Sequence, residues 1–413
     1  MKKILILSTV TAISLFATNG ANLIGLGAES RALGGTGIAM YQGSENAMTN
    51  PALLGKTEGG KKELTIAATI FKADVSVTTT GSDATTRKSD MGTSVIPYIA
   101  HAHRITDDIT LGFGLYGTGG MGVDYTGYND DPTTGQFGLF NMKSELQIMQ
   151  LAPTIAYNKD NYGLGLTAII QYGKLSIDFT DFGGNDIGDG KMSSDTGFGL
   201  QIGGFYNISN NITLAGVFKS AIDMEYGDEI SKASIAFGYG QGNQNFEVKS
   251  DHLEQPAEFG IGISATNENI TYTLDYKTIK WGSAKGYKDF GWEDQKVFAL
   301  GLKYQLKESW IGLGYNKSNN PIPNNIDSTS VAGGANQNGH TMNTFNYVLF
   351  PGTITKAYTF GGGLNIDKDS SIELAYNIMP EVSDTISGAT VQLGNITTIH
   401  KQQALTVAYK FNF

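Results

Sequence analysis

The sequence predicts an all-β protein: a 14-stranded antiparallel transmembrane β-barrel with an N-terminal hatch, or plug, inside the lumen. Two observations predict the barrel. Segments of alternating apolar and polar residues recur from Lys62 to the C-terminus, and the turns between them are alternately short and long. Only 16% of the 413 residues are charged, yet no internal run is apolar and long enough to span a bilayer as a helix. The hatch is predicted from the segment that precedes the strands.

The N-terminus has the layout of a secretory signal peptide. Lys2 and Lys3 precede an apolar run over residues 4–16, and small residues follow it. We assign residues 1–20 to this peptide, with cleavage after Ala17 or Ala21. The run is too short to span a bilayer as an anchor. The chain is therefore expected to leave the cytoplasm and to reside in the outer membrane of a Gram-negative bacterium.

The remaining composition argues against several function classes. A net charge of -10 disfavours nucleic acid as a partner, and the chain has no cysteine for disulfides. His101 and His103 share a strand face, but no neighbouring Cys or acidic residue completes a metal site. The glycine-rich stretch 238–244 lacks the Lys of a phosphate-binding loop. We therefore expect no enzyme activity, no cofactor and no metal.

The last strand shows the alternation best. In "QALTVAYKFNF", Leu405, Val407 and Tyr409 fall on one face, and Thr406 and Lys410 on the other. Six short polar turns imply six hairpins, and a first and a last strand bring the total to fourteen, an even number as in bacterial barrels. Tyr and Phe gather at strand ends, as in interfacial girdles, whereas a soluble β-sandwich would place more charge outside. Residues 63–413 are assigned to the barrel.

Residues 21–62 lack this alternation and are rich in glycine. The lumen of a fourteen-stranded barrel leaves a pore unless something fills it. This segment adjoins the first strand at the periplasmic rim, so we expect it to fold inward as the filler. Within it, Asn50 suits an N-cap and Pro51 the first position of a short helix that starts before Leu53.

Several motifs together resemble one family. Ser30-Arg31-Ala32-x-Gly34 followed by Asn50-Pro51-Ala52 resembles the N-terminal hatch of the FadL/TodX (OMPP1) outer-membrane channels. "GGMGVDY" at 119–125 and "LQIMQLAPTIAYN" at 146–158 are similar to it as well. The resemblance implies passive uptake of long-chain fatty acids or aromatic hydrocarbons. It implies capture in an extracellular groove, passage past the hatch, and sideways release into the membrane at an inward kink of the third strand.

Three sets of residues are candidates for these steps. The large loop after the third strand is expected to line the ligand groove with apolar side chains, namely Met121, Val123, Phe137, Leu139, Phe140 and Met142. The hatch or gate is assigned to Arg31, Asn50, Pro51 and Ala52, and the kink to Gly112, Gly114 and Gly117. Packing of the loop on itself and close strand approach at the glycines remain open as alternatives.

The expected partners are a hydrophobic small molecule, outer-membrane lipid and lipopolysaccharide, and the barrel-assembly machinery acting on the C-terminal Phe413; the protein is expected to be a monomer. A non-specific porin or a structural or adhesive barrel is the alternative, but an added N-terminal segment and an apolar loop argue for a plugged barrel. A carboxylate ligand would need a cation, for which Arg31, Arg87, Arg104, Lys219 and Lys277 are candidates.

Overall fold

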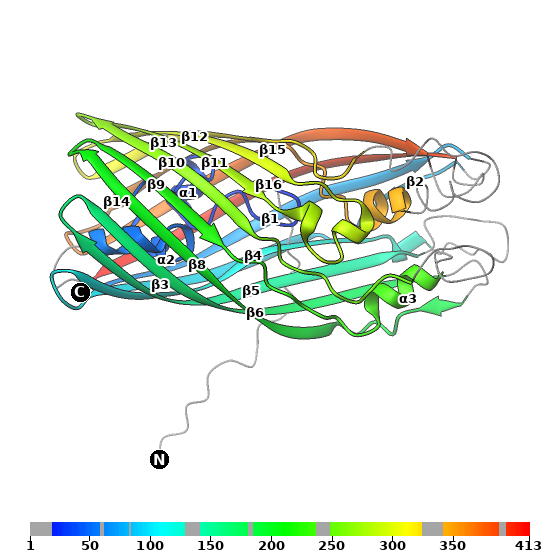
Figure 1. The fold of residues 1–413 in the computed structure, drawn as a ribbon. Helices are drawn as coiled ribbons and strands as arrows, with labels where there is room; N and C mark the ends of the chain where they lie inside the picture. Colours follow the sequence, from blue (N-terminus) through cyan, green and yellow to red (C-terminus); the bar gives the residue numbers. More distant parts are fainter. Residues whose placement is uncertain are drawn as a thin grey trace, which may run out of the picture.

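A single closed antiparallel barrel dominates the computed structural model (Figure 1). The structure describes residues 19–57, 62–81, 84–128, 141–180, 185–236, 248–323, 342–387 and 394–413. Among these residues the sheet holds sixteen strands, and all but two short ones, β2 and β7, form the wall. The predicted barrel of fourteen strands is thus confirmed.

The elements follow in chain order. The wall strands are β1 (Lys62–Thr79), β3 (Thr93–Arg104), β4 (Ile109–Asp124), β5 (Lys143–Lys159), β6 (Tyr162–Thr180), β8 (Ser193–Ser209), β9 (Ile212–Lys219), β10 (Glu258–Asn267), β11 (Ile270–Ile279), β12 (Gln295–Gln305), β13 (Ser309–Ser318), β14 (Lys356–Asn365), β15 (Ser370–Ser387) and β16 (Asn395–Asn412). The short strands are β2 (Thr86–Lys88) and β7 (Asp186–Ile187). The helical turns are α1 (Ala28–Ala32), η1 (Gly43–Glu45), α2 (Asn46–Thr49), η2 (Pro51–Lys56), η3 (Thr126–Tyr128), α3 (Glu229–Ala236), η5 (Trp281–Ser283), η6 (Lys288–Phe290) and η7 (Phe345–Leu349).

The barrel closes where β16 pairs with β1, in register from Glu63–Asn412 to Thr79–Ile396. Because a bilayer offers no water to unpaired backbone groups, this closure removes the two free sheet edges. All six predicted short turns join neighbouring strands at one end of the barrel, and the long connections lie at the other end (Figure 1). By the usual orientation of such barrels, the short turns face the periplasm and the long loops the exterior.

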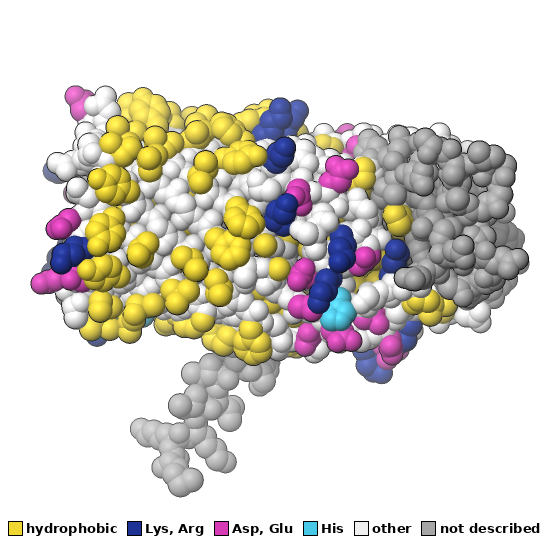
Figure 2. Space-filling view, viewed as in Figure 1, with side chains coloured by type: hydrophobic (Ala, Val, Ile, Leu, Met, Phe, Trp, Pro, Cys, Tyr) yellow, Lys and Arg dark blue, Asp and Glu magenta, His cyan; other side chains and the backbone are white. Residues whose placement is uncertain are grey.

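The outer face of the wall carries an apolar band, yellow in Figure 2. In β16, Leu405, Val407 and Tyr409 are exposed toward the lipid, whereas Ala404 and Thr406 are buried toward the lumen. This is the alternation that the sequence predicts. No helix among the described residues is both long and apolar enough to cross a membrane.

We predict that a charged residue on the outer face of the wall destabilises the barrel more at the middle of the membrane than at its surface. Leu313 is 62% exposed in the middle of β13, and Ile366 is 54% exposed at a short turn. We expect Leu313→Arg to lower the free energy of unfolding by about 2–4 kcal/mol and Ile366→Arg by at most about 1 kcal/mol. Equilibrium denaturation in lipid vesicles measures both, and equal losses would contradict the assignment of this face to lipid.

Candidate functional site

The N-terminal segment, residues 19–57, lies inside the barrel and is surrounded by wall strands (Figure 1). Helix α1 packs against β13 to β16, α2 against β3 to β5, and η2 against β4, β5, β6 and β8. Every side chain of the segment is buried except those of Leu26, Tyr41, Thr49 and Lys56, which are half-buried. The segment therefore fills the lumen toward the end that carries the short turns.

A buried ion-pair network holds the segment to β15 and β16. The Lys410 ammonium lies 3.1 Å from the Glu45 carboxylate and 3.0 Å from the Glu373 carboxylate, and it donates to the carbonyl oxygen of Gln42 at 3.1 Å. The hydroxyl of Tyr98 also donates to Glu45. Removing one member of a buried ion pair costs about 3–5 kcal/mol. The network therefore fixes where the segment sits against the wall.

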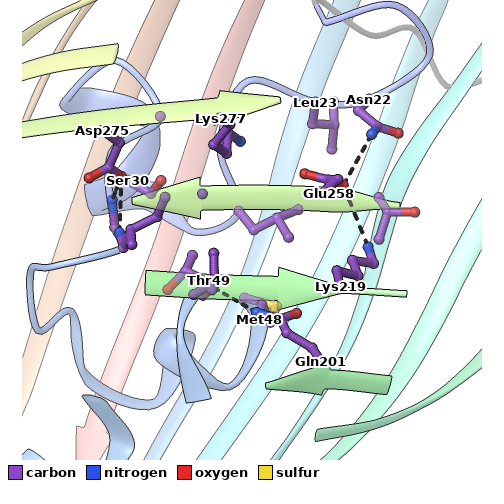
Figure 3. A pocket seen from close by; sticks show the side chains of 18 residues that line it. Asn22, Leu23, Ser30, Met48, Thr49, Gln201, Lys219, Glu258, Asp275 and Lys277 are labelled. Atoms are coloured by element: carbon purple, nitrogen blue, oxygen red, sulfur yellow. Dashed lines mark hydrogen bonds and ion pairs between the residues drawn. The ribbon is translucent and has the colours of Figure 1, made fainter. Parts of the chain in front are cut away.

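Two further wall side chains, from β11 and β12, also bind the segment. The Asp275 carboxylate of β11 accepts hydrogen bonds from the backbone N–H groups of Gly37 at 2.8 Å and Ile38 at 3.0 Å (Figure 3). The Lys303 ammonium of β12 lies 2.5 Å from the Glu29 carboxylate of α1. Directional polar contacts thus join the segment to the wall, beside apolar contacts such as those in the cluster of Leu33 with Trp310.

Arg31, which the sequence places in the gate, is buried within this interface. Its Nε donates to the Gly25 carbonyl at 3.1 Å and its Nη1 to the Thr406 hydroxyl at 3.4 Å. The Asn377 amide donates to the Arg31 carbonyl at 2.8 Å. Burial lowers the pKa of Arg31 to about 10. Its contacts join the segment to β15 and β16.

Asn50-Pro51-Ala52 begins η2 as the sequence predicts. The Asn50 side-chain oxygen accepts from the Ala52 N–H at 3.1 Å, and Pro51 occupies the first position of the helix. The Asn50 amide also donates to the Ile38 carbonyl at 2.6 Å. The motif thus caps its own helix and joins the two halves of the segment.

Two glycines of the wall let this motif approach the backbone of β6 and β8. A Cβ atom at Gly165 would lie 2.3 Å from the Ala52 nitrogen, and one at Gly203 would lie 2.0 Å from the Asn50 side-chain oxygen. No real side chain tolerates such distances, so the motif fits only because both positions lack a side chain. A Cβ at Gly204, the next residue, would lie 3.5 Å from its nearest neighbour, a Leu164 side-chain carbon, which is an ordinary contact distance.

The start of the segment pairs with an irregular part of β4. The Gly120 N–H donates to the Ala21 carbonyl at 2.9 Å, and the Leu23 N–H donates to the Thr118 carbonyl at 3.1 Å. The register of β4 with β5 shifts between Gly117 and Gly119, as at a β-bulge. Gly112 and Gly114, in contrast, pair regularly with β5. A Cβ at these two positions would lie within 2.9 Å of side chains of the segment, Leu54 and Met48 respectively.

The ladder between β3 and β4 is interrupted at the same level. It ends at the pair Tyr98–Tyr116, so that, within the described residues, the rest of β3 pairs only with β1. The chain that precedes β3 contacts β4 again through the Asp90 N–H, which donates to the Asp124 carbonyl at 2.8 Å. Between these two points, the described residues of β3 and β4 form no backbone pair with each other, and on this edge of β4 residues 21–23 supply backbone partners.

An apolar cavity lies just beyond, among the long loops. It is a small, partly open cavity with about 330 Å³ of space between atoms when open solvent is included, and its lining consists of Met121, Leu175, Ile230, Leu253, Tyr287, Phe290, Trp292, Phe345, Asn346 and Phe350. The amide side chain in this lining is hydrogen-bonded, because Trp292 donates to the Asn346 side-chain oxygen at 3.0 Å and the Asn346 amide donates to the Phe290 carbonyl at 2.8 Å. Burial raises the pKa of Tyr287 above its ordinary value, so this phenol stays neutral. The cavity presents no charge to a ligand.

The structure brings only some of the predicted groove residues to this cavity. Met121 lines it, and Val123 and Met142 are buried in the same apolar cluster without lining it. Phe137, Leu139 and Phe140 lie outside the described residues. The aromatic residues of the two later loops, 280–294 and 342–355, were not among the groove residues predicted from the sequence. The aromatic-rich stretch "WGSAKGYKDFGW", residues 281–292, was a signal for them.

A second, polar cavity lies in the lumen between the segment and β8 to β11 (Figure 3). Lys219, Glu258 and Lys277 line it, and Asn22 donates to Glu258 at 3.3 Å. The Lys219 ammonium lies 3.9 Å from the Glu258 carboxylate. Both lysines thus face the lumen as the sequence indicates. The described part of the chain holds no group of three or more His, Asp or Glu that could bind a metal.

A larger side chain at Gly203 tests whether the N-terminal segment blocks the lumen. We expect Gly203→Val to displace Asn50-Pro51-Ala52 and so to unblock the lumen. The variant should then show a steady ion conductance in planar bilayers. Gly204→Val, on the adjacent residue with clearance, is the matched control and should conduct like the unmodified protein. A Gly203→Val variant with the same conductance as the unmodified protein would contradict the role of this contact in blocking the lumen.

Comparison with known proteins agrees with this geometry. A long-chain fatty acid transport protein of Escherichia coli is 24% identical over 372 residues, which cover 76% of this chain and 80% of that protein. A Chlorobium limicola protein of unassigned function is 38% identical over 104 residues, 25% of this chain and half of its own length. The solved P. putida toluene transporter TodX superposes with a TM-score of 0.68 at 18% identity, covering 95% of this chain and 99% of TodX.

The family model described as outer membrane protein transport protein (OMPP1/FadL/TodX) matches residues 4–337. The match covers far more than half of the chain, and the closed barrel agrees with it. The chain therefore belongs to the OMPP1/FadL/TodX family of outer-membrane transport proteins.

Proposed function

We propose that this protein is a channel for passive uptake of hydrophobic compounds, with residues 21–62 acting as its hatch. One observation carries the proposal. Met121 of β4 lines the apolar cavity, and Gly119, two residues earlier, pairs with Asn22 of the segment where the β3–β4 ladder is interrupted. A capture site, a blocking segment and a weak point of the wall thus meet on one strand.

The cavity favours an uncharged aromatic compound as the cargo. Its lining is aliphatic and aromatic, with one amide that is already hydrogen-bonded. A carboxylate placed there would lose its hydration without gaining a cation. The solved relative TodX, a toluene transporter, supports this choice.

A long-chain fatty acid is the second candidate. It is favoured by Lys219 and Lys277 in the polar lumen cavity, where a carboxylate would find positive charge, and by the fatty acid transporter of E. coli among the relatives. Arg31 does not serve this purpose well, because its side chain is only 3% exposed and donates to protein oxygens.

The proposed route has three steps. The compound enters the cavity among the long loops. Residues Ala21 to Leu23 then leave β4, while Asn50-Pro51-Ala52 stays seated on Gly165 and Gly203. The compound passes between β3 and β4 into the membrane. Transport is driven by diffusion, and no cofactor takes part.

Processing and assembly complete the proposal. We assign residues 1–20 to a cleaved signal peptide and residues 63–413 to the barrel of a monomer. Lys62 and Phe413 exchange two backbone hydrogen bonds, of 3.0 and 2.9 Å, at the barrel seam. The Phe413 side chain is 56% exposed, which leaves it accessible to the barrel-assembly machinery.

Tryptophan fluorescence tests the cavity. Trp292 lines it and Trp281 packs on Trp292, whereas Trp310 lies in the wall near the short turns. In a Trp310→Phe background we expect toluene to quench the remaining emission saturably. Met121→Glu should weaken toluene binding at least about tenfold, because it buries an unpaired carboxylate.

The matched control for that titration is Leu306→Glu, at an exposed short turn, which should leave toluene binding unchanged. Tighter binding of laurate than of toluene would contradict the aromatic cargo and favour a fatty acid. Quenching without saturation would contradict the cavity itself.

The contact of the segment with β4 tests sideways release. A Cβ at Gly119 would lie 2.2 Å from the Ala21 carbonyl oxygen, so Gly119→Ala should displace residues 21–23. We expect faster uptake of a hydrophobic fluorescent dye by cells, with ion conductance unchanged. Gly216→Ala, whose nearest neighbour is 3.6 Å away, is the control. Dye uptake no faster than in the control would contradict the release step.

A further inference from the structure

Three exposed lysines lie side by side on the outer surface of β12, β13 and β14. Lys317 is directly opposite Lys356 in the β13–β14 ladder. Lys317 is also opposite Phe298 in the β12–β13 ladder, which makes Lys296 its diagonal neighbour. Opposed side chains have Cβ atoms about 4.5–5.5 Å apart, and diagonal ones about 7–8 Å. The three ammonium groups can therefore converge on one small anion.

These side chains point away from the lumen. Lys296, Lys317 and Lys356 are exposed, whereas the residues next to them in each strand, such as Val297 and Ala357, are buried toward the interior. The same outer face continues toward the membrane with the apolar side chains of the three strands. The lysines therefore belong to the outer surface and not to the transport path.

Their height on the barrel places them at the level of lipid head groups. Tyr315 and Tyr358, one step closer to the short turns on the same face, contact each other with ring centroids 5.4 Å apart. Tyrosines in such positions mark the membrane interface. Figure 2 shows Lys and Arg side chains, interleaved with Asp and Glu, where the yellow band ends toward the long loops.

The charges of these lysines are not compensated within the described residues, where none of the three lies within 4.0 Å of a carboxylate. Two other lysines of the outer face are paired, because Lys72 and Lys88 each lie 3.7 Å from Asp74. Directly opposed like charges destabilise a sheet. An external anion between the lysines would remove this cost.

We propose that Lys296, Lys317 and Lys356 bind a phosphate group of the phosphorylated glycolipid, lipopolysaccharide, in the outer leaflet. Lysine is a good phosphate ligand as a point charge. The patch lies above an apolar strand face, which suits a molecule that has both a phosphate and acyl chains. The site is separate from the cavity among the loops, so it goes beyond the proposed transport function.

Native mass spectrometry of the full mature protein in neutral detergent tests the site. The probes are lipid A with both phosphates, lipid A with its phosphates removed, and phosphatidylglycerol. We expect the unmodified protein to retain bisphosphorylated lipid A. The triple variant Lys296→Gln, Lys317→Gln and Lys356→Gln should bind it on the order of 10- to 100-fold more weakly, because each lysine near a lipid surface contributes to the attraction.

The matched control replaces three lysines at the short-turn rim with Gln, namely Lys159, Lys307 and Lys368, and should bind lipid A like the unmodified protein. Heat-modifiable migration on gels checks that each barrel is folded, and Lys317→Gln alone is the substitute if the triple variant is not. Equal binding by variant and control, or undiminished binding of dephosphorylated lipid A, would overturn the proposal. Tighter binding of phosphatidylglycerol would overturn the assignment to the glycolipid.

Discussion

The hydrogen-bonded closure of β16 on β1 is the constraint on which the rest of the structure depends. A wall inside a bilayer cannot leave backbone groups unpaired, so the sheet has to close. Once fourteen strands close, they enclose a lumen that their own side chains do not fill. The chain fills it with residues 19–57, which precede β1 in the sequence and lie inside the barrel. The N-terminal segment thus occupies space that the strand number creates.

Filling a lumen with backbone requires close approach and many polar partners, and both are supplied by the wall. Gly165 and Gly203 give space to Asn50-Pro51-Ala52, while Asp275 and Lys410 satisfy N–H groups, carbonyls and carboxylates of the segment. Polar contacts of this kind hold a segment firmly in one position, yet water can replace them if the segment moves.

Strand number, short turns and the outward face were predictable from the sequence, because each follows from local alternation and turn residues. The cap at Asn50 was predictable for the same reason. The aromatic cavity was not, since Trp292 and Phe345 belong to loops that are far apart in sequence and meet only in the closed barrel. Glycine content alone did not predict where β4 is irregular. Gly112 and Gly114, both assigned to a kink, pair regularly with β5 and give space to the N-terminal segment. The register shift lies between Gly117 and Gly119.

The contrast between the two cavities supports sideways release as the proposed route. The loop cavity is lined by no charged side chain, whereas the cavity in the lumen below it is lined in part by Lys219, Glu258 and Lys277. A hydrocarbon that moved down this lumen would displace water and hydrogen bonds from charged groups without replacing them. Movement past Met121 and between β3 and β4 leads instead to lipid, where the hydrocarbon is solvated as well as in the cavity. The proposed sideways route avoids this cost, and it agrees with the end of the β3–β4 ladder at the pair Tyr98–Tyr116.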